Sequence, residues 1–234
     1  MAEGISGNIE KIQQRIEAAC SRCGRDPAAV RLVAVTKTVS VDKIREALAA
    51  GVTVCGENYM QEARAKIGML PAAASWHFIG HLQSNKARQA AELFDLIHSV
   101  DSLHLAHALD KAAAAAGKLL RVLVQVNISG EQSKHGIDPR ETVRLVREMS
   151  ECSHVRVAGL MTIPPLLPSP EESRPYYAAL RRLRDDMAGL LPGSVSLSEL
   201  SMGMSADFEV AIEEGATLVR VGTAIFGTRP RPGI

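Results

Sequence analysis

Eight short apolar runs alternate with helical segments along almost the whole chain, and this alternation constrains the fold more than any other feature. The apolar runs, rich in Val, Leu and Ile, cover residues 32–35, 52–55, 76–79, 96–100, 120–128, 155–161, 195–200 and 218–221. The helical segments lie near residues 41–50, 60–70, 85–93, 103–116, 139–151, 176–190 and 206–214. Strict alternation indicates parallel strands joined by helical crossovers. Eight such units predict an α/β fold, a single (β/α)8 TIM-type barrel domain over residues 1–234.

An extra helix is predicted before the first strand. Ile5, Ile9, Ile12 and Ile16 recur at intervals of three and four residues, which places them on one face of a helix. Only seven helical segments follow strands, since the chain after the eighth strand is short and rich in Pro and Arg. We therefore expect the N-terminal helix to cover part of the barrel surface left exposed there. A doubly wound open sheet is the alternative, although the chain has no Gly-rich dinucleotide loop.

The composition argues against several classes of protein. The net charge is +1 and no long run carries one sign, so we expect no nucleic-acid-binding surface. No apolar stretch approaches membrane-spanning length, so we expect no membrane association. The N-terminus lacks a basic region followed by an apolar core and therefore does not resemble a secretory signal. A cytoplasmic protein is the expectation.

Neither the cysteines nor the histidines predict a metal site. Cys20 and Cys23 have C-x-x-C spacing, but no second pair completes a zinc site, and the end of a helix is a poor position for a redox pair. We expect reduced, structural thiols. His77 and His81 are four residues apart, but a strand end and a loop separate them, so the geometry of a helical metal site does not apply. No third histidine or acidic ligand is evident nearby.

Lys37 ends the first apolar run, Val-Arg-Leu-Val-Ala-Val-Thr-Lys. The carboxyl end of a strand is where ligands bind in barrels and in open α/β sheets. An amine held beside apolar walls loses its proton more readily and can then attack a carbonyl carbon. The alternative is a lysine that simply marks the solvated end of a strand.

The last two strands carry features of a phosphate site. Barrels often bind phosphate with the loops after strands seven and eight. Residues 201–205, Ser-Met-Gly-Met-Ser, let an anion approach the backbone closely, and Gly222 and Thr223 offer backbone donors and a hydroxyl. Ordinary turns are the alternative for either loop. Arg220 lies within an apolar strand and needs a partner, which is either a carboxylate such as Glu199 or a ligand in the barrel mouth.

A strand-end lysine, a phosphate-binding end and a nearby arginine are what a pyridoxal 5′-phosphate (PLP) site requires. With these residues the chain resembles the pyridoxal phosphate homeostasis proteins, whose fold is similar to the barrel domain of alanine racemase. The resemblance extends over nearly the whole chain. The matching segments are 34–37 (Ala-Val-Thr-Lys), 56–59 (Gly-Glu-Asn-Tyr), 76–80 (Trp-His-Phe-Ile-Gly), 83–86 (Gln-Ser-Asn-Lys), 159–161 (Gly-Leu-Met), 201–205 and 219–223 (Val-Arg-Val-Gly-Thr).

The resemblance implies a site for PLP and a role for each residue in it. The implied cofactor-binding residues are Lys37, Asn58, Met161, Ser201, Ser205, Arg220, Gly222 and Thr223. Lys37 would carry PLP as an internal aldimine, and Arg220 would face the pyridine nitrogen. The phosphate would lie against Gly222, Thr223 and the 201–205 loop, with either serine contributing. Lys134, in the loop after the fifth strand, could reach the pocket mouth.

The resemblance also bears on catalysis. Alanine racemase takes one of its two bases, a tyrosine, from a C-terminal β domain of a partner subunit, and we expect this chain to lack such a domain. We therefore expect no catalytic residue, and a monomer or weak dimer that holds PLP and exchanges it with PLP-dependent apoenzymes. Two alternatives stay open. One is a PLP-dependent, racemase-like enzyme, and the other is a cofactor-free aldolase that uses Lys37 on a phosphorylated sugar.

Overall fold

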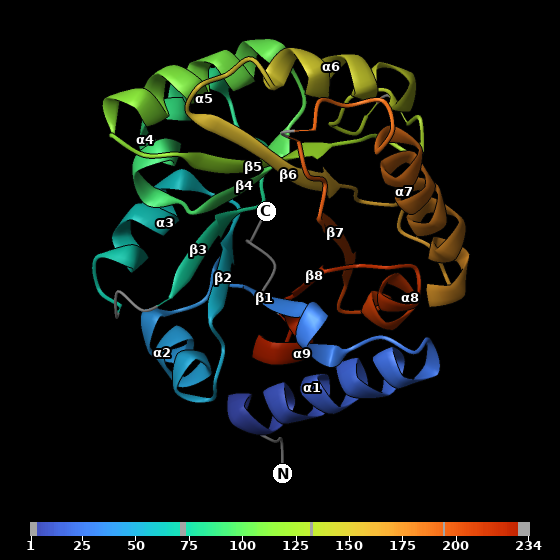
Figure 1. Cartoon of the computed structure of the whole chain (residues 1–234). Helices are drawn as coiled ribbons and strands as arrows, with labels where there is room; N and C mark the ends of the chain where they lie inside the picture. Colours follow the sequence, from blue (N-terminus) through green and yellow to red (C-terminus); the bar gives the residue numbers. More distant parts are fainter. Residues whose placement is uncertain (1–3, 71–73, 132, 194, 229–234) are drawn as a thin grey trace.

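A computed structural model describes residues 4–70, 74–131, 133–193 and 195–228. Eight parallel strands form a closed barrel in which each strand pairs with the next and the last pairs with the first (Figure 1). The strands are β1 (Arg31–Val35), β2 (Val54–Glu57), β3 (Ser75–Phe78), β4 (Leu96–Val100), β5 (Leu120–Gln125), β6 (Val155–Met161), β7 (Glu199–Met204) and β8 (Leu218–Val221). The predicted TIM-type barrel is confirmed.

Helices surround the barrel and fill the connections between its strands. They are α2 (Val41–Ala49), α3 (Met60–Ile67), α4 (Ala87–Leu93), α5 (Leu103–Ala115), α6 (Thr142–Met149), α7 (Arg174–Met187), α8 (Phe208–Glu213) and α9 (Thr223–Phe226). Short 3-10 turns are η1 (Pro27–Ala29), η2 (Ser84–Lys86), η3 (Pro139–Glu141) and η4 (Pro170–Ser173). The expectation that no helix follows the eighth strand was wrong, because α9 begins directly after β8. It has only four residues and ends at Gly227, whose φ of +81° leaves the helical region.

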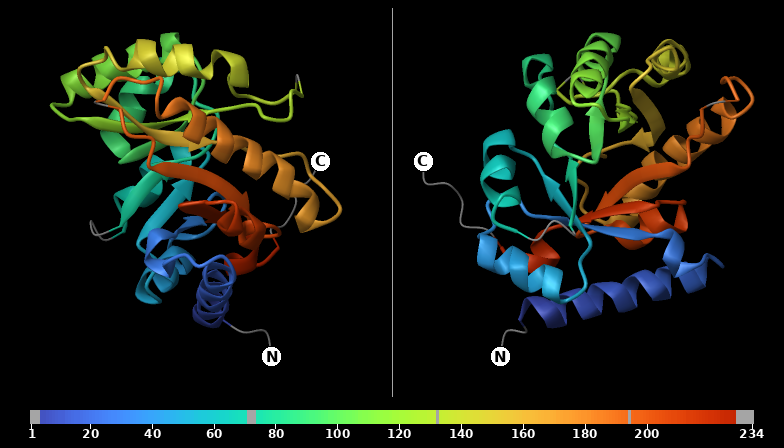
Figure 2. Two further views of the ribbon diagram at one scale, coloured as in Figure 1. Left: turned by 45° about the vertical axis from the view of Figure 1, so that its right-hand side comes forward. Right: turned by 60° about the vertical axis from the view of Figure 1, so that its left-hand side comes forward.

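The predicted N-terminal helix, α1 (Ile5–Arg22), takes the place of a full eighth barrel helix. It lies between α8 and α2 and contacts both of them as well as α9 (Figures 1 and 2). Its four periodic isoleucines are all buried. The side-chain amide of Asn8 donates a 2.8 Å hydrogen bond to the carbonyl of Ile225 in α9. The helix therefore closes the gap that the short α9 leaves in the outer layer, as its apolar face predicts.

The seventh strand lies four residues later than predicted. Residues 195–200 were expected to form it, whereas β7 spans Glu199–Met204 and pairs with β8 through Ser201 opposite Leu218 and Met204 opposite Arg220. The pairing is irregular between these two positions, and Gly203 has a φ of +89° there. A side chain on Gly203 would lie 2.5 Å from the Cβ of Ala211, so only glycine allows α8 to pack this closely. Most of the 201–205 segment is therefore strand and not loop.

The other differences are small. The second strand begins two residues later than expected, and β5 ends at Gln125 and not at 128. Inside the barrel a separate apolar cluster consists of Val33, Val54, Leu96, Leu123, Ala158, Met161 and Leu218. These residues come from β1, β2, β4, β5, β6 and β8. Within the described ranges, no helix is long and apolar enough to cross a lipid bilayer.

Candidate functional site

Lys37 lies two residues beyond β1, at the carboxyl end of the barrel, in a sharp turn. We call residues 36–38 the lysine turn. Thr36 is fully buried, Lys37 is half-buried and Thr38 is exposed. Thr38 has a φ of +58°, a left-handed conformation that β-branched residues rarely adopt. The surrounding structure must therefore hold this turn in place.

A buried cluster of charges supports the lysine turn from below. Lys66 Nζ lies 2.8 Å from both Glu57 Oε1 and Glu62 Oε2, and it donates a 2.7 Å bond to the carbonyl of Thr36. The hydroxyl of Thr36 donates to Glu57 at 2.6 Å, and the amide of Thr38 donates to Glu62 at 2.7 Å. Burial raises the pKa of Glu57, while the bonds from Lys66 and Thr36 oppose that shift. Both ends of the lysine turn are thus tied to α3.

Asn58 follows β2, and its side-chain carbonyl oxygen is buried. Its Oδ1 makes no hydrogen bond to any described residue. Gly80 presses against its backbone, since a Cβ on Gly80 would lie 2.4 Å from the Asn58 carbonyl oxygen. A buried polar atom needs a partner to offset its lost hydration. The backbone of Asn58 is therefore closely packed. Its side-chain Oδ1 can accept a hydrogen bond from a donor on a ligand.

Arg220 is the second charged group of the candidate site, and it forms no ion pair with a described carboxylate. It lies on β8 and is 5% exposed. Its guanidinium donates to Ser201 Oγ at 2.6 Å and to the carbonyl of Thr162 at 2.9 Å. The alternative pairing with Glu199 is not formed, because Glu199 binds Arg31 and Arg121 instead. Among the described residues no carboxylate lies within ion-pair distance of Arg220.

A chain of hydrogen bonds inside the barrel extends from Arg220 through Ser201 to two histidines. Sequence reasoning missed His98 and considered His77 only as a metal ligand. His98 Nδ1 lies 2.9 Å from Ser201 Oγ, and His98 Nε2 lies 3.0 Å from His77 Nδ1. Burial lowers the pKa of His77 to about 4 and that of His98 well below its ordinary value. Both imidazoles are therefore neutral, and the chain adds no second positive charge beside Arg220. The signal available in the sequence was that both histidines interrupt apolar runs predicted to be buried strands, 76–79 and 96–100.

The two candidate serines have different partners. Ser201 belongs to the chain that holds Arg220. Ser205 Oγ instead accepts from the backbone amides of Gly222 and Ala224, at 3.2 and 3.4 Å, and so joins the ends of β7 and β8. Gly222 is buried and Thr223 is exposed. The structure thus separates an arginine-holding serine from a serine beside the proposed phosphate loop.

The remaining predicted residues lie around the same end of the barrel. Met161 ends β6 and is fully buried in the interior cluster. β1 pairs with β8, with Ala34 opposite Val221, so Lys37 extends from the strand next to the one that carries Arg220. Lys134, in the loop after β5, forms a 3.4 Å ion pair with Glu131. The described contacts do not place Lys134 against Lys37.

The structure also bears on the metal sites that were considered from the cysteines and from His81. All four cysteines are free thiols, and the Cys23 thiol donates to the carbonyl of Ala19. The statement that no third ligand lies near His81 was wrong. Asp101 and His135 both reach it from other loops. These residues are far apart in the sequence, so only closure of the barrel brings them together.

Comparison with known proteins gives consistent matches over almost the whole chain. The family model for the alanine racemase N-terminal domain matches residues 7–230. The pyridoxal phosphate homeostasis protein of Aquifex aeolicus is 44% identical over 222 residues, which cover 94% of this chain and 96% of that protein. That of Pseudomonas aeruginosa is 46% identical over 228 residues, or 96% of each chain. PipY of Synechococcus elongatus, solved with PLP bound, is 41% identical with a TM-score of 0.80, covering 91% of this chain and all of that one. The chain therefore belongs to the pyridoxal phosphate homeostasis protein family.

Proposed function

We propose that this protein binds PLP at the carboxyl end of the barrel, covalently through Lys37, and holds it for other proteins without catalysing a reaction of its own. PipY, which shares 41% of its sequence with this chain, was solved with PLP bound. The curated relatives carry the name of homeostasis proteins and not that of an enzyme. The proposal places the protein in the cytoplasm, where PLP-dependent apoenzymes would receive the cofactor.

The observation that carries the proposal is that the buried guanidinium of Arg220 makes no direct ion pair with any described carboxylate. A guanidinium stays charged in proteins and has five N–H donors in a fixed plane. Ser201 and Thr162 accept two of its bonds, and neither is an anion. A buried charge in this state is costly unless a ligand completes its contacts. A pyridine nitrogen or a phosphate oxygen at the barrel mouth is an acceptor of the right kind.

The residues at the other end of the site suit a phosphate ester. The amides of Gly222 and Ala224 converge on one oxygen, the hydroxyl of Ser205. Backbone N–H groups that converge in this way also suit a phosphate oxygen. Thr223 adds an exposed hydroxyl at the same junction. We assign the phosphate to this junction and assign Ser201 to Arg220.

Bound PLP would supply an aldehyde that combines with an amine and a ring that withdraws electrons. In our proposal Lys37 Nζ provides the amine, and the lysine turn fixes its direction. Arg220 donates to the ring nitrogen and keeps it unprotonated, because Arg cannot itself give up its proton. An unprotonated ring withdraws electrons less strongly. Ser201 and the two neutral imidazoles behind it hold Arg220 in that position, which favours retention of the cofactor over turnover.

The test is a spectrum and an intact mass of the purified protein before and after borohydride reduction. Wild type should show a visible absorbance band that reduction removes, together with a mass increase that peptide mapping assigns to Lys37. Lys37→Ala should lose both and keep the fold, whereas Lys134→Ala should keep both. A reduced adduct found mainly on Lys86 or Lys134 would overturn the assignment. A wild-type protein without any PLP adduct would overturn the proposal and favour the aldolase alternative.

The non-catalytic part of the proposal has a separate test. A panel of amino acids is added to the PLP-loaded protein, and the products are followed by chiral chromatography. We expect slow spectral changes without sustained turnover. Racemisation at ordinary enzymatic rates, roughly 1–10³ per second, would establish the enzyme alternative instead. Sedimentation at several concentrations tests the proposed monomer or weak dimer.

A further inference from the structure

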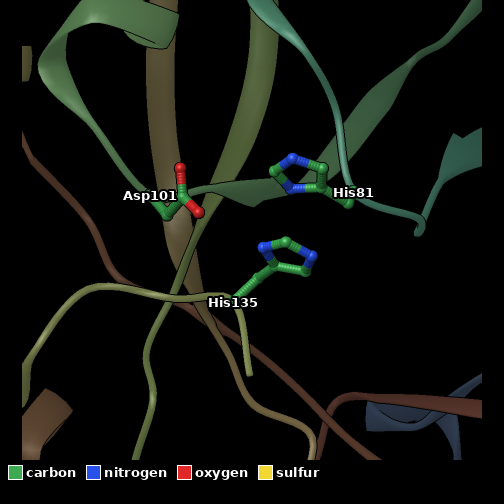
Figure 3. Close-up of side chains that lie close together, drawn as sticks. All are labelled: His81, Asp101 and His135. Carbon is green, nitrogen blue, oxygen red and sulfur yellow. The ribbon is translucent and has the colours of Figure 1, made fainter. Parts of the chain in front are cut away.

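Two imidazoles and one carboxylate meet above the carboxyl ends of β3, β4 and β5. His81 lies in the loop after β3, Asp101 follows β4 directly, and His135 lies in the loop after β5. The three side chains approach one another, with the carboxylate facing the ends of both rings (Figure 3). Each offers one ligand atom, and these three atoms all lie within 4.8 Å of one another. None of the three is used by the proposed PLP site.

The donor atoms of these residues have no other partner among the described residues. In the part of the chain that the structure describes, no hydrogen bond or ion pair involves the side chain of His81, Asp101 or His135. The two rings stack, with centroids 3.7 Å apart and planes 8° apart. Both histidines are exposed and Asp101 is half-buried, so an ion can enter from solvent. Three converging donors without partners are the arrangement of a ligand site.

We propose that His81, Asp101 and His135 bind one divalent ion of the zinc class, with a fourth position left for water. Two imidazoles and one carboxylate form a donor set that zinc uses where it keeps an open position. Calcium and magnesium prefer sites made of oxygen alone, so the two nitrogens disfavour them. The absence of a thiolate from the set disfavours Cu(I) and iron–sulfur clusters.

The spacing needs only a modest adjustment to bind the ion. A tetrahedral ion with bonds of about 2.0–2.1 Å keeps its donor atoms roughly 3.3–3.5 Å apart. The donor atoms lie within 4.8 Å of one another, so their separations must shorten by at most about 1.4 Å, and the stacked rings must rotate so that their lone pairs converge on one point. Rotation about the side-chain bonds of these loop residues, of which the two histidines are exposed, would achieve this without moving a strand.

The backbones that carry the two histidines are already fixed. Gly80, which precedes the first, packs on the backbone of Asn58, where a Cβ would meet the carbonyl oxygen at 2.4 Å. Gly136, which follows the second, has a φ of +122° and packs against the amide of Asn127, where a Cβ would meet the nitrogen at 2.8 Å. The ion would bind a prepared pair of loops, so little backbone ordering opposes its affinity.

Occupancy would tie the loop after β5 to the loop after β3. The β5 loop also carries Lys134, directly before His135. The ion would therefore restrain a segment at the barrel mouth and stabilise the folded protein by a free energy that grows with the logarithm of the ion concentration above Kd. This inference does not rest on the proposed PLP function. A protein without PLP could still bind the ion, and a protein without the ion could still bind PLP.

The test is calorimetric titration of the full chain with Zn²⁺, using protein purified without a histidine tag and stripped of metal by a chelator. The Cys23→Ser background removes the exposed thiol of the C-x-x-C pair as a competitor. We expect one ion per chain. His81→Ala, His135→Ala and Asp101→Asn should each weaken binding by roughly tenfold or more, since even indirect supports of a ligand change affinity by that factor. His107→Ala removes an exposed histidine on α5 and should leave binding unchanged.

Thermal unfolding with and without Zn²⁺ gives an independent readout. The ion should raise the melting temperature of wild type and of His107→Ala, and it should not do so in the three ligand variants. Melting temperatures close to wild type in chelator would show that these variants are folded. A wild type that binds no Zn²⁺, or binding that survives both His81→Ala and His135→Ala, would overturn the proposal.

Discussion

The buried cluster beneath the lysine turn makes a quantitative prediction for Lys66→Met. This change keeps the length of the side chain and removes its charge, so Glu57 loses its cation. Glu57 is fully buried, and its other oxygen, Oε2, has no hydrogen bond within the described residues. The Thr36 hydroxyl would remain as the donor to Glu57. Breaking a buried ion pair from one side typically costs about 3–5 kcal/mol, because the other charge is left uncompensated.

Protonation of Glu57 limits that cost. Each pH unit above the ordinary value of 4.5 adds about 1.4 kcal/mol to the free energy of holding a carboxyl protonated. At pH 7 this limit is about 3.4 kcal/mol, so we expect Lys66→Met to lower the free energy of unfolding by about 3 kcal/mol. The pKa of Glu57 rises further in the variant, so its folded state binds the proton that its unfolded state releases. The variant should therefore regain stability as the pH falls from 7 toward 4.5.

The assay is urea unfolding followed by circular dichroism at pH 7 and pH 5. The gap between Lys66→Met and wild type should shrink by roughly 2–3 kcal/mol between these values. The matched control is the double variant Lys66→Met/Glu57→Gln, which removes both charges and should recover part of the loss at pH 7. A loss below about 1 kcal/mol, or a gap that does not change with pH, would refute the reasoning.

Three further predictions concern the phosphate end, the buried histidines and the contact of β6 with β7. Thr223→Ala should weaken PLP binding roughly ten- to a hundredfold in a titration of the absorbance band, because one bond to a charged group is lost while backbone donors remain; an unchanged affinity would move the phosphate elsewhere. His77 takes up a proton near pH 6.5 in the unfolded state but only near pH 4 in the folded state, so the free energy of unfolding should fall by up to about 3 kcal/mol as the pH drops between these values. In urea unfolding, His77→Gln should show a smaller dependence of stability on pH. An equal dependence in both proteins would contradict this. Gly159→Ala should lower the melting temperature sharply or prevent folding, because a Cβ would lie 1.9 Å from the Glu199 carbonyl oxygen. The control Gly193→Ala should change the melting temperature little, because a Cβ there meets no atom within 4 Å. Similar melting temperatures for the two variants would show that β7 can move away.

The strands and helices could be predicted because their signals are local. Apolar runs of strand length and the isoleucine periodicity of α1 depend only on near neighbours in the chain. Residues 195–200 misled the prediction for the same reason, since they carry apolar residues but lie largely before β7. The position of β7 depends on its pairing with β6 and β8, and this pairing cannot be read from the order of residues in the chain. The close approach of α8 at Gly203 contributes to it as well.

The site divides in the same way. Lys37, Arg220 and the Gly222–Thr223 junction stand out in the sequence because each interrupts or ends an apolar strand. The partners of these residues do not stand out in the sequence. Glu199 and Arg220 lie on neighbouring strands, but the register sets Met204 and not Glu199 opposite Arg220. The Arg220 guanidinium donates to Ser201 Oγ at 2.6 Å, whereas Glu199 forms its ion pairs with two other arginines.

The sequence by itself determined the order and type of the elements, the barrel class and the chemical groups available at the strand ends. These follow from periodicity and from residue type, both of which are written along the chain. Only the tertiary structure decided which groups meet: Ser201 with Arg220, Lys66 with the lysine turn, and His81 with Asp101 and His135. The physical reason is that closing the barrel fixes strand register and brings distant loops to one rim, and contact distances follow from that closure and not from separation in the sequence.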